Sequence, residues 1–310
     1  MTATMTGLPR QRQAKRRRSS LRSGWVPWVM LAPAIIVISG MILYPAINAL
    51  WLSVTSTNLL NTAQQQFIGF ENFVEAFTSP EFFTALRNSA VWTVGNVFFQ
   101  VVLGMIGALI LNSKIRARGA IRGLVLVPWA TPSVLVALMW MWMLDPNLGI
   151  INHLLQAVGL QQEAHAWLAD PATALPTLMM VDIWQGVPFF AVMILAALQG
   201  VPGELLEAAK IDGANAWQTF WRVVLPLIMP TLLITTILRL IWTANYFDLI
   251  LILTNGGPAN STLTLPLFAY HTAYRGFDFG LAAALGVVQA CILAVLVVFY
   301  IRQIRKSELA

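Results

Sequence analysis

The sequence has 310 residues, of which 58% are hydrophobic and only 10% are charged, and its mean hydropathy is +0.71. Soluble domains carry about 25% charged residues, so this composition excludes an ordinary soluble protein and predicts an integral membrane protein. The formal net charge of +6 arises from 19 basic and 13 acidic residues, and their positions guide the prediction of topology.

Six apolar segments are long enough to cross a bilayer, which takes about 20 helical residues. They comprise residues 25–54, 88–111, 120–144, 174–199, 223–254 and 279–301. Their residues are continuously apolar and do not alternate with polar ones, which disfavours a β-barrel. The first and fifth segments are long, so we expect tilting or kinking, and Pro33 and Pro45 are kink sites in the first. We therefore predict an all-α membrane protein with six transmembrane helices.

Most basic residues fall in groups that six crossings place on one side of the membrane. Sixteen of the 19 belong to these groups: Arg10, Arg12, Lys15, Arg16, Arg17, Arg18, Arg22, Lys114, Arg116, Arg118, Arg122, Lys210, Arg222, Arg302, Arg305 and Lys306. Residues 55–86 and 145–173 contain none. By the positive-inside rule, both termini and residues 202–226 are expected in the cytoplasm. The two loops without basic residues, both of which carry acidic ones, are expected outside.

This topology predicts five parts along the chain. They are a basic cytoplasmic tail (1–24), a first transmembrane helix (25–54), an external loop (55–87), a core of five helices (88–301) and a second cytoplasmic tail (302–310). The basic tail could bind nucleic acid, but its position directly before a span favours a topology anchor that contacts anionic lipid headgroups. We expect no nucleic-acid partner.

Residues 202–226 form a polar island between two apolar segments. Pro202 and Gly203 interrupt the fourth span, and Glu204 and Glu207 are expected in the first turn of a new short helix. Gly213 is expected to end that helix, and Asn215 to cap a second one. Leu225 and Pro226 are expected to turn the chain into the fifth span. On composition alone, an interfacial linker resting in the headgroups explains the segment as well as a docking element does.

The residue order within the island resembles a known family. EAAKIDGANAWQTFWRVVLP, residues 207–226, resembles the EAA loop of binding-protein-dependent ABC importer permeases. The matching positions are Glu207, Ala208, Ala209, Asp212, Gly213, Phe220, Leu225 and Pro226. The segments FIGFENFVEAF (67–77), DPNLGIINHLLQAVGL (145–160) and FDLILILTNGGPANSTLTLPLFAY (247–270) resemble the carbohydrate-uptake branch of that family, which includes maltose, glycerol-phosphate and trehalose permeases.

The resemblance implies the fold of a type I ABC importer permease in a prokaryotic plasma membrane. It also implies that a dimer of ATPase subunits uses ATP and Mg²⁺ and pulls on the loop. In that complex, Glu207 would pair with a basic residue of the ATPase. An external binding protein would deliver a sugar, and a second permease chain, more often a different one than a copy, would close the path.

Few ionisable residues lie within the predicted spans, where exposure to lipid is costly. Asp182 and Arg239 come from the fourth and fifth spans at depths that differ by about 6 Å, at a rise of about 1.5 Å per residue. They are expected to pair or share a polar network, either as a structural link or as a sugar contact. Trp184, Trp242, Asn245 and Tyr246 are candidate neighbours for a sugar, and Asp248 is expected nearer the external mouth.

Two other classes of protein, a carrier or channel and an enzyme, fit the sequence less well than the importer. A self-sufficient secondary carrier or channel is typically built from internal repeats or broken helices, and the sequence has no clear inverted repeat. An enzyme is disfavoured because the sequence has no GxxxxGKS/T, GxGxxG, HExxH or CxxC motif. We therefore expect no catalytic residue, no bound metal and no cofactor in this chain.

Overall fold

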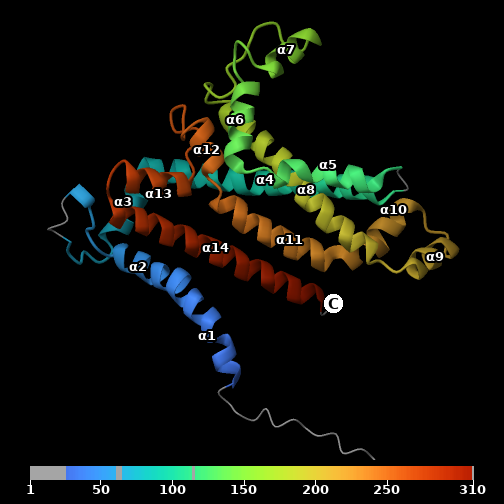
Figure 1. Cartoon of the computed structure of the whole chain (residues 1–310), viewed down its shortest axis with the longest axis horizontal. Helices are drawn as coiled ribbons and strands as arrows, with labels where there is room; N and C mark the ends of the chain where they lie inside the picture. Colours follow the sequence, from blue (N-terminus) through green and yellow to red (C-terminus); the bar gives the residue numbers. More distant parts are fainter. Residues whose placement is uncertain (1–25, 61–64, 114–115, 309–310) are drawn as a thin grey trace, which may run out of the picture. The chain divides into compact units, whose positions relative to one another are not determined.

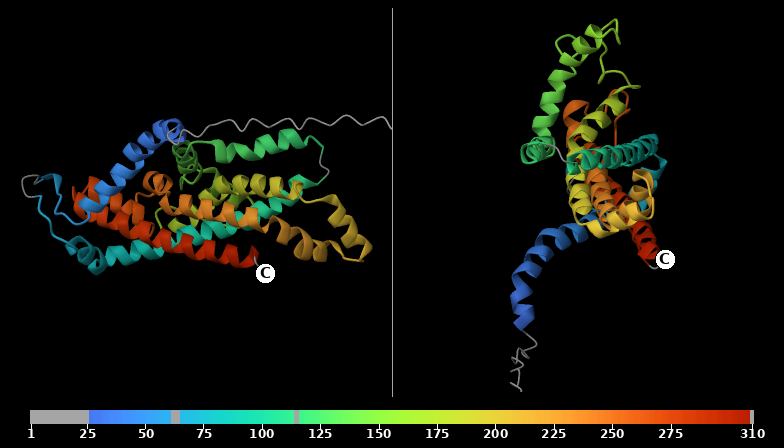
Figure 2. Two further views of the ribbon diagram at one scale, coloured as in Figure 1. Left: turned by 90° about the horizontal axis from the view of Figure 1, so that it is seen from below. Right: turned by 90° about the vertical axis from the view of Figure 1, so that its right-hand side faces the viewer.

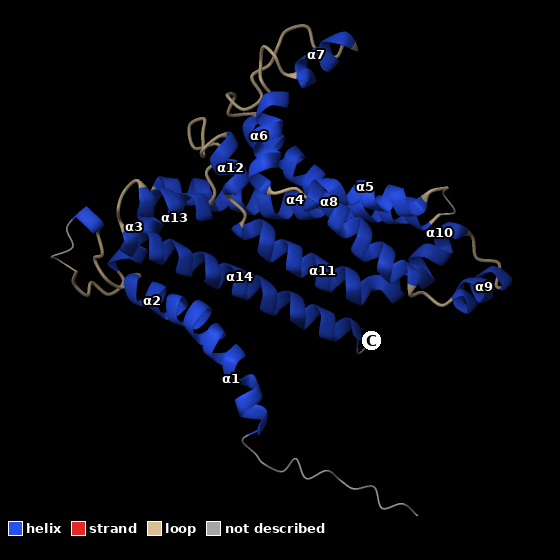
Figure 3. Cartoon of the chain, viewed as in Figure 1, coloured by secondary structure: helices blue, strands red, loops and turns tan. Residues whose placement is uncertain are grey.

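A computed structural model describes residues 26–60, 65–113 and 116–308 of the chain. In this part of the chain, helices are joined by turns and loops without any strand, apart from two isolated bridges (Figure 3). The predicted basic tail at residues 1–24 lies outside the described residues, as do Trp25 and the last two residues. The all-α prediction is confirmed for the described residues.

The chain divides into two units, residues 1–48 and 49–310. The first unit contains α1 (Val26–Ile38), a π-helical turn (Ser39–Leu43) and the start of α2 (Tyr44–Leu52). Together they form a helix, Pro27–Leu52, that is long and apolar enough to cross a membrane. The π-turn lies just before Pro45, which has no N–H to donate to the carbonyl four residues earlier, so the regular helical ladder is interrupted there.

The second unit contains the remaining helices (Figure 1). They are α3 (Glu71–Thr78), α4 (Pro80–Asn112), α5 (Arg118–Ala130), α6 (Ser133–Met143), α7 (Ile150–Ala157), α8 (Ala174–Gln199), α9 (Gly203–Ile211), α10 (Ala216–Thr219), a second π-turn (Phe220–Val224), α11 (Leu225–Asn245), α12 (Asp248–Leu253), α13 (Leu265–Tyr274) and α14 (Phe279–Glu308). Helices α4, α8, α11 and α14 lie side by side along most of their length in Figures 1 and 2.

The most extensive contact joins α4 and α8. Gly104 of α4 faces the Phe190 side chain so closely that a Cβ at position 104 would lie 2.4 Å from the Cβ of Phe190. Gly107, one turn further on, faces Ala191 in the same way at 3.3 Å. Small residues at a helix interface let backbones approach, and dispersion contacts then stabilise the pair where water and its hydrophobic effect are absent.

Five described helices are long and apolar enough to cross a membrane, or six if the bent pair α5–α6 counts as one span. The prediction of six spans therefore holds only with that pair, and its continuous helix over 120–144 is wrong. Helices α5 and α6 meet at 90° around Thr131 and Pro132. Pro132 cannot continue the backbone ladder and forces Thr131 into an extended conformation (ψ 130°), which ends α5.

Other predicted boundaries also differ from the structure. Helix α4 begins at Pro80, eight residues before the predicted start, because the Ser79 hydroxyl caps it by accepting the Phe82 N–H at 3.2 Å. The fifth span breaks at Tyr246 and Phe247, so α12 is a separate helix. Helix α14 continues to Glu308, so residues 302–308 of the predicted tail continue the last helix beyond the span.

The two ends of the second unit carry different elements. Helices α9 and α10 and the start of α5 lie at one end, towards which α14 also runs, and α3 and α13 lie at the other (Figures 1 and 2). Several basic residues predicted to share one side belong to these elements: Arg122 in α5, Lys210 in α9, Arg222 in the second π-turn and Arg302 in α14. Which side of the membrane this end faces stays a prediction.

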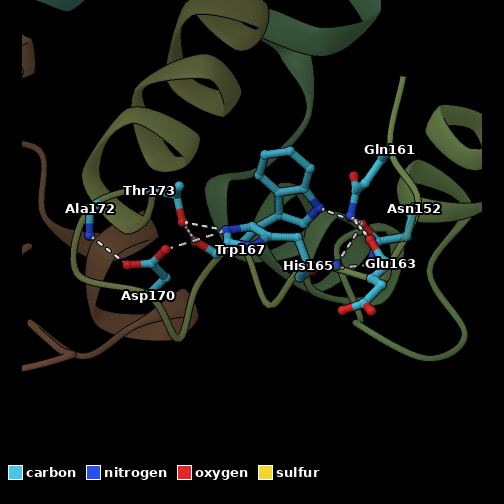
Figure 4. A network of polar contacts seen from close by, with 8 residues as sticks. All are labelled: Asn152, Gln161, Glu163, His165, Trp167, Asp170, Ala172 and Thr173. Atoms are coloured by element: carbon cyan, nitrogen blue, oxygen red, sulfur yellow. Dashed lines mark hydrogen bonds and ion pairs between the residues drawn. The ribbon is translucent and has the colours of Figure 1, made fainter. Parts of the chain in front are cut away.

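The segment between α6 and α8 is organised around Asn152 of α7 (Figure 4). Its buried amide donates to the His165 carbonyl at 3.0 Å, and Trp167 Nε1 donates to its Oδ1 at 2.8 Å. The His165 ring lies 3.1 Å from the Thr173 hydroxyl and 3.6 Å from Asp170. His165 thus has a structural role in this loop, and the described residues include no cluster of His, Cys, Asp or Glu that could hold a metal.

Candidate functional site

The polar island folds as two short helices around a glycine, as predicted. Pro202 precedes α9 in an extended conformation, and Gly203 is its first residue. Gly213 follows the C-cap with φ +78°, a backbone conformation that favours glycine, and the Ala214 N–H bonds back to the Ala209 carbonyl at 2.9 Å. Only Glu204 lies in the first turn of α9, so the expected place of Glu207 there is wrong by one turn.

Asn215 caps α10 through a capping box. Its side chain accepts the Gln218 N–H at 2.9 Å, while the Gln218 side chain accepts the Asn215 N–H at 3.0 Å. From there the chain stays helical through the second π-turn into α11. The predicted turn at Leu225 and Pro226 is therefore wrong, because Pro226 lies inside a continuous helix, just after the second π-turn, which accommodates its missing N–H.

The α9–α10 loop exposes much of its surface within this chain. Glu207, Ala208, Asp212 and Gly213 are exposed, and only Ala209 of the motif residues in α9 is buried. Large apolar side chains beside them are also exposed: Leu205 (42%), Ile211 (86%), Trp217 (69%) and Trp221 (48%). Apolar surface of this kind, rimmed by charged residues, is typical of a protein interface.

A second candidate site is a cavity of about 260 Å³ between α5, α6, α8 and α11. Its aromatic lining residues are Trp129, Trp242 and Tyr246. Its polar lining residues are Thr131, Ser133, Asp182, Gln185, Arg239 and Thr243. The break between α5 and α6 places Thr131 and Ser133 at this cavity, which explains how the bend shapes the site.

Asp182 and Arg239 form an ion pair in the cavity wall, as predicted. Arg239 Nη2 donates to Asp182 Oδ1 at 3.2 Å. Gln100 of α4 joins them, because its Nε2 donates to Asp182 Oδ2 at 2.9 Å and its Oε1 accepts from Arg239 Nε at 2.8 Å. Three helices are thereby linked through groups that are buried, or nearly so. Buried charges persist where their partners are supplied in this way.

Gly186 of α8 provides the space for this cluster. A Cβ at position 186 would lie 2.4 Å from the Gln100 amide and 2.6 Å from Arg239 Nη2. Both distances are well below van der Waals contact, so any larger residue would displace one of the two side chains. The requirement for glycine here is therefore steric.

The structure brings some of the predicted path residues together and separates others. Tyr246 lies at the cavity and donates its hydroxyl to Gln185 Oε1 at 3.2 Å, and Trp242 packs against Phe189 with ring centroids 5.5 Å apart. Trp184 instead packs against Trp140 at 5.7 Å, and Asn245 interacts with Gln289 of α14 at 3.1 Å. Neither Trp184, Asn245 nor Asp248 lines this cavity.

Sequence reasoning missed Gln100, Gln185 and Gly186, and it did not place Trp129 at the cavity. A signal for Gln100 existed in α4, where Asn88, Trp92, Asn96 and Gln100 follow one another at four-residue intervals and are all buried. Polar amides at that spacing share one helix face and avoid lipid. No comparable pattern distinguishes Trp129 from the other tryptophans of the chain.

The family model described as "Binding-protein-dependent transport system inner membrane component" matches residues 100–306. This range covers more than half of the chain and includes the α9–α10 loop and all four helices that surround the cavity. The chain therefore belongs to this family of ABC transporter permeases, which are inner-membrane subunits.

Individual relatives extend the similarity over nearly the whole chain. The trehalose/maltose transport system permease protein MalF of Thermococcus litoralis is 30% identical over 281 residues, covering 91% of this chain and 94% of that protein. A permease chain in the crystal structure of a bacterial ABC transporter that imports the acidic polysaccharide alginate is 27% identical, with a TM-score of 0.79 and coverage of 91% and 96%. The alginate transporter in complex with its alginate-bound periplasmic protein matches with a TM-score of 0.76 at 26% identity, covering 89% of this chain and 92% of that one.

Proposed function

We propose that the chain is the permease subunit of an ATP-driven importer of a sugar or sugar derivative, and that its α9–α10 loop couples it to ATPase subunits. Family membership and the names of the relatives support the importer and the sugar. The order of Glu207, Ala208, Ala209 and Gly213 supports the coupling role. A self-sufficient carrier or channel is not favoured, because it leaves this loop without a function.

The observation that carries the coupling proposal is the continuity of helix from the loop to the cavity. The run from Ala216 to Asn245 is helical without a break, which supports the proposal that α10 and α11 move as one element. Arg239 and Trp242 lie on this same run and line the cavity. At about 1.5 Å per residue, a displacement applied near Ala216 acts on groups about 35 Å away along the helix.

The proposed cycle assigns each step to a partner. ATPase subunits bind ATP and Mg²⁺, close, and move the α9–α10 loop, with Glu207 held by a basic residue of the ATPase. The bundle then switches the side to which its cavity opens, and an external binding protein delivers the sugar. We also propose a second permease chain, different from this one, to complete the wall of the path.

The proposal places the α9–α10 end of the second unit in the cytoplasm, together with both chain termini. Support comes from the described basic residues on the elements at that end and from the absence of Lys and Arg in residues 55–86 and 145–173. With this orientation, the external segments are residues 55–79, the α6–α8 connection and the α12–α13 region. The coupling loop, residues 202–226, is cytoplasmic.

The cavity is proposed as part of the sugar path, with Asp182, Arg239, Trp242 and Tyr246 in its wall. Aromatic faces and hydrogen-bonding groups together suit a sugar ring, which has apolar faces and polar edges. Asp248, which begins α12 outside the cavity, is assigned to the external approach. Trp184 and Asn245 are assigned to packing.

Co-purification of the ATPase tests the coupling proposal. Glu207→Lys and Gly213→Asp are expected to leave the chain in the membrane with its normal helical content while the ATPase is lost from the purified complex. Glu163→Lys and Gly159→Asp are matched controls, because Glu163 is also exposed and Gly159 also has a positive φ (+73°) after a short helix, both in a predicted external segment. Normal ATPase recovery with both loop variants would contradict the proposal.

Transport in reconstituted vesicles separates the importer from the carrier. Uptake by this chain and its permease partner is expected only when the ATPase subunits and ATP are added. Uptake that follows an ion gradient without the ATPase would support the carrier instead.

A further inference from the structure

The ion pair in the cavity wall exposes only its cation. The Arg239 side chain retains 12% of its surface exposure, whereas that of Asp182 is completely buried. Both carboxylate oxygens of Asp182 are already used, one by Arg239 and the other by Gln100. A ligand in the cavity therefore meets a guanidinium and has no access to its counter-ion.

One edge of that guanidinium is free. A guanidinium has five N–H donors in a planar fork, and Arg239 directs Nε to Gln100 and one Nη2 hydrogen to Asp182. The three remaining donors, two on Nη1 and one on Nη2, have no partner among the described residues. They form the outer edge of the fork, where two parallel N–H bonds match the two oxygens of a carboxylate or sulfonate.

The cavity lining also includes the hydroxyls of Thr131, Ser133 and Thr243, which can donate or accept, but it has no free carboxylate. Gln185 is satisfied within the wall, since its Oε1 accepts from Tyr246 and its Nε2 donates to the Thr131 carbonyl at 3.2 Å. The lining residues include no carboxylate besides Asp182. A neutral sugar presents hydroxyls that both donate and accept, and it finds no free carboxylate here to accept its protons. A ligand rich in acceptors fits better.

From this arrangement we infer that the cavity selects a sugar bearing an anionic oxygen group, held by the outer edge of Arg239 and flanked by Trp129 and Trp242. This inference rests on the proposed importer function and adds the charge class of its substrate. Gln100 acts as a positioning residue, because its amide holds the Nε side of the guanidinium and turns the other edge towards the cavity.

The test compares matched pairs of sugars on the purified complex that contains the ATPase. Glucuronate and glucose, galacturonate and galactose, and mannuronate and mannose each differ only by a carboxylate in place of a hydroxymethyl group. Ligand-observed NMR titrations on the complex in nanodiscs, without binding protein, give the dissociation constants. In at least one pair, the uronate is expected to bind about tenfold more tightly or better, as a charge-assisted bidentate contact implies.

Substitutions of Arg239 test whether its guanidinium causes the tighter binding of the uronate. Arg239→Lys keeps the charge and loses the fork, so uronate affinity is expected to fall about tenfold. Because Arg239→Gln alone leaves Asp182 without its cation, the double variant Asp182→Asn with Arg239→Gln is the second test, and its uronate preference is expected to disappear. Arg275→Gln is the control, since Arg275 is exposed and lies outside the cavity.

Several results would overturn the inference. One is that the neutral sugar binds as tightly as the uronate in every pair. Another is that no uronate binds at all. A third is that the preference for the uronate persists in the double variant. Each leaves the proposed function intact if the ATPase is present in the complex. Loss of the ATPase from the unmodified complex would instead contradict the proposed function.

Discussion

The α9–α10 loop and the Arg239 cavity differ in where their residues come from and in what those residues contact. The loop is a single stretch of sequence whose motif residues are exposed, and its shape is set by neighbours such as Asn215 and Gln218. The cavity cluster joins α4, α8 and α11, with Gln100 separated from Arg239 by 139 positions. Its side chains are buried against one another.

This difference separates the two ways in which a substitution can abolish transport. Changes in the loop should spare the fold of the chain and act through the partner that covers it. Changes in the cavity should alter the stability of the chain itself, because each buried group there satisfies another. The following predictions are ordered by the expected loss of stability of the purified chain.

Arg239→Met is expected to be the most destabilising change, by about 3–5 kcal/mol, because it leaves the buried Asp182 carboxylate without its cation. The measurement is the thermal midpoint of the purified protein in detergent. The double variant Asp182→Leu with Arg239→Met removes both charges and should recover part of the loss. Equal midpoints for wild type and Arg239→Met would show that the pair is not a structural link.

Gly186→Ala is expected to destabilise by about 1–3 kcal/mol, since its Cβ would overlap the Gln100 amide and the Arg239 guanidinium. Gly286→Ala in α14 is the matched control, because a Cβ there meets nothing within 4 Å and alanine favours a helix. The two variants should shift the thermal midpoint in opposite directions. Similar shifts would contradict the steric role of Gly186.

Asn215→Ala removes the cap of α10 and is expected to cost about 1 kcal/mol of local helix stability. Faster amide hydrogen exchange at Gln218 and Thr219 would report the fraying. Gln218→Ala, which removes only the reciprocal bond, should have a smaller effect. Unchanged exchange in Asn215→Ala would mean that the π-turn and α11 hold this helix without the cap.

Glu207→Lys is expected to change the stability of the isolated chain by no more than about 0.5 kcal/mol. Glu207 is exposed, and its side chain makes no hydrogen bond or ion pair with the described residues. Its effect should appear only in the complex, as loss of the ATPase. A large drop in the thermal midpoint of the chain alone would contradict the proposal that loop residues act through the partner and not on the stability of the chain.

The loop could be predicted from sequence to the level of single residues. Gly213 ends α9 at a positive φ, and Asn215 caps α10, because both depend on local backbone geometry that a short sequence specifies. The errors were also local: Glu207 lies one turn later than expected, and Pro226 continues a helix because the π-turn before it accommodates the missing N–H.

The cavity could be predicted only in part. The pairing of Asp182 with Arg239 was predictable, since few charges lie within the apolar segments and those that do require partners. Gln100 and Gly186 were not, because their roles depend on the rotation of α4 and α8 about their axes. The same holds for the 90° bend at Thr131 and Pro132, which a continuous apolar pattern conceals.

The sequence by itself determined the all-α membrane class, the approximate spans, the EAA-like motif and the pair of charges that needed each other. Composition, helix length and local backbone preferences are properties of contiguous residues, so they can be read without the fold. Only the tertiary structure decided which member of that pair faces a cavity, because the burial of Asp182 and the exposure of Arg239 depend on how separate helices pack. The substrate class that we infer for the cavity follows from that packing.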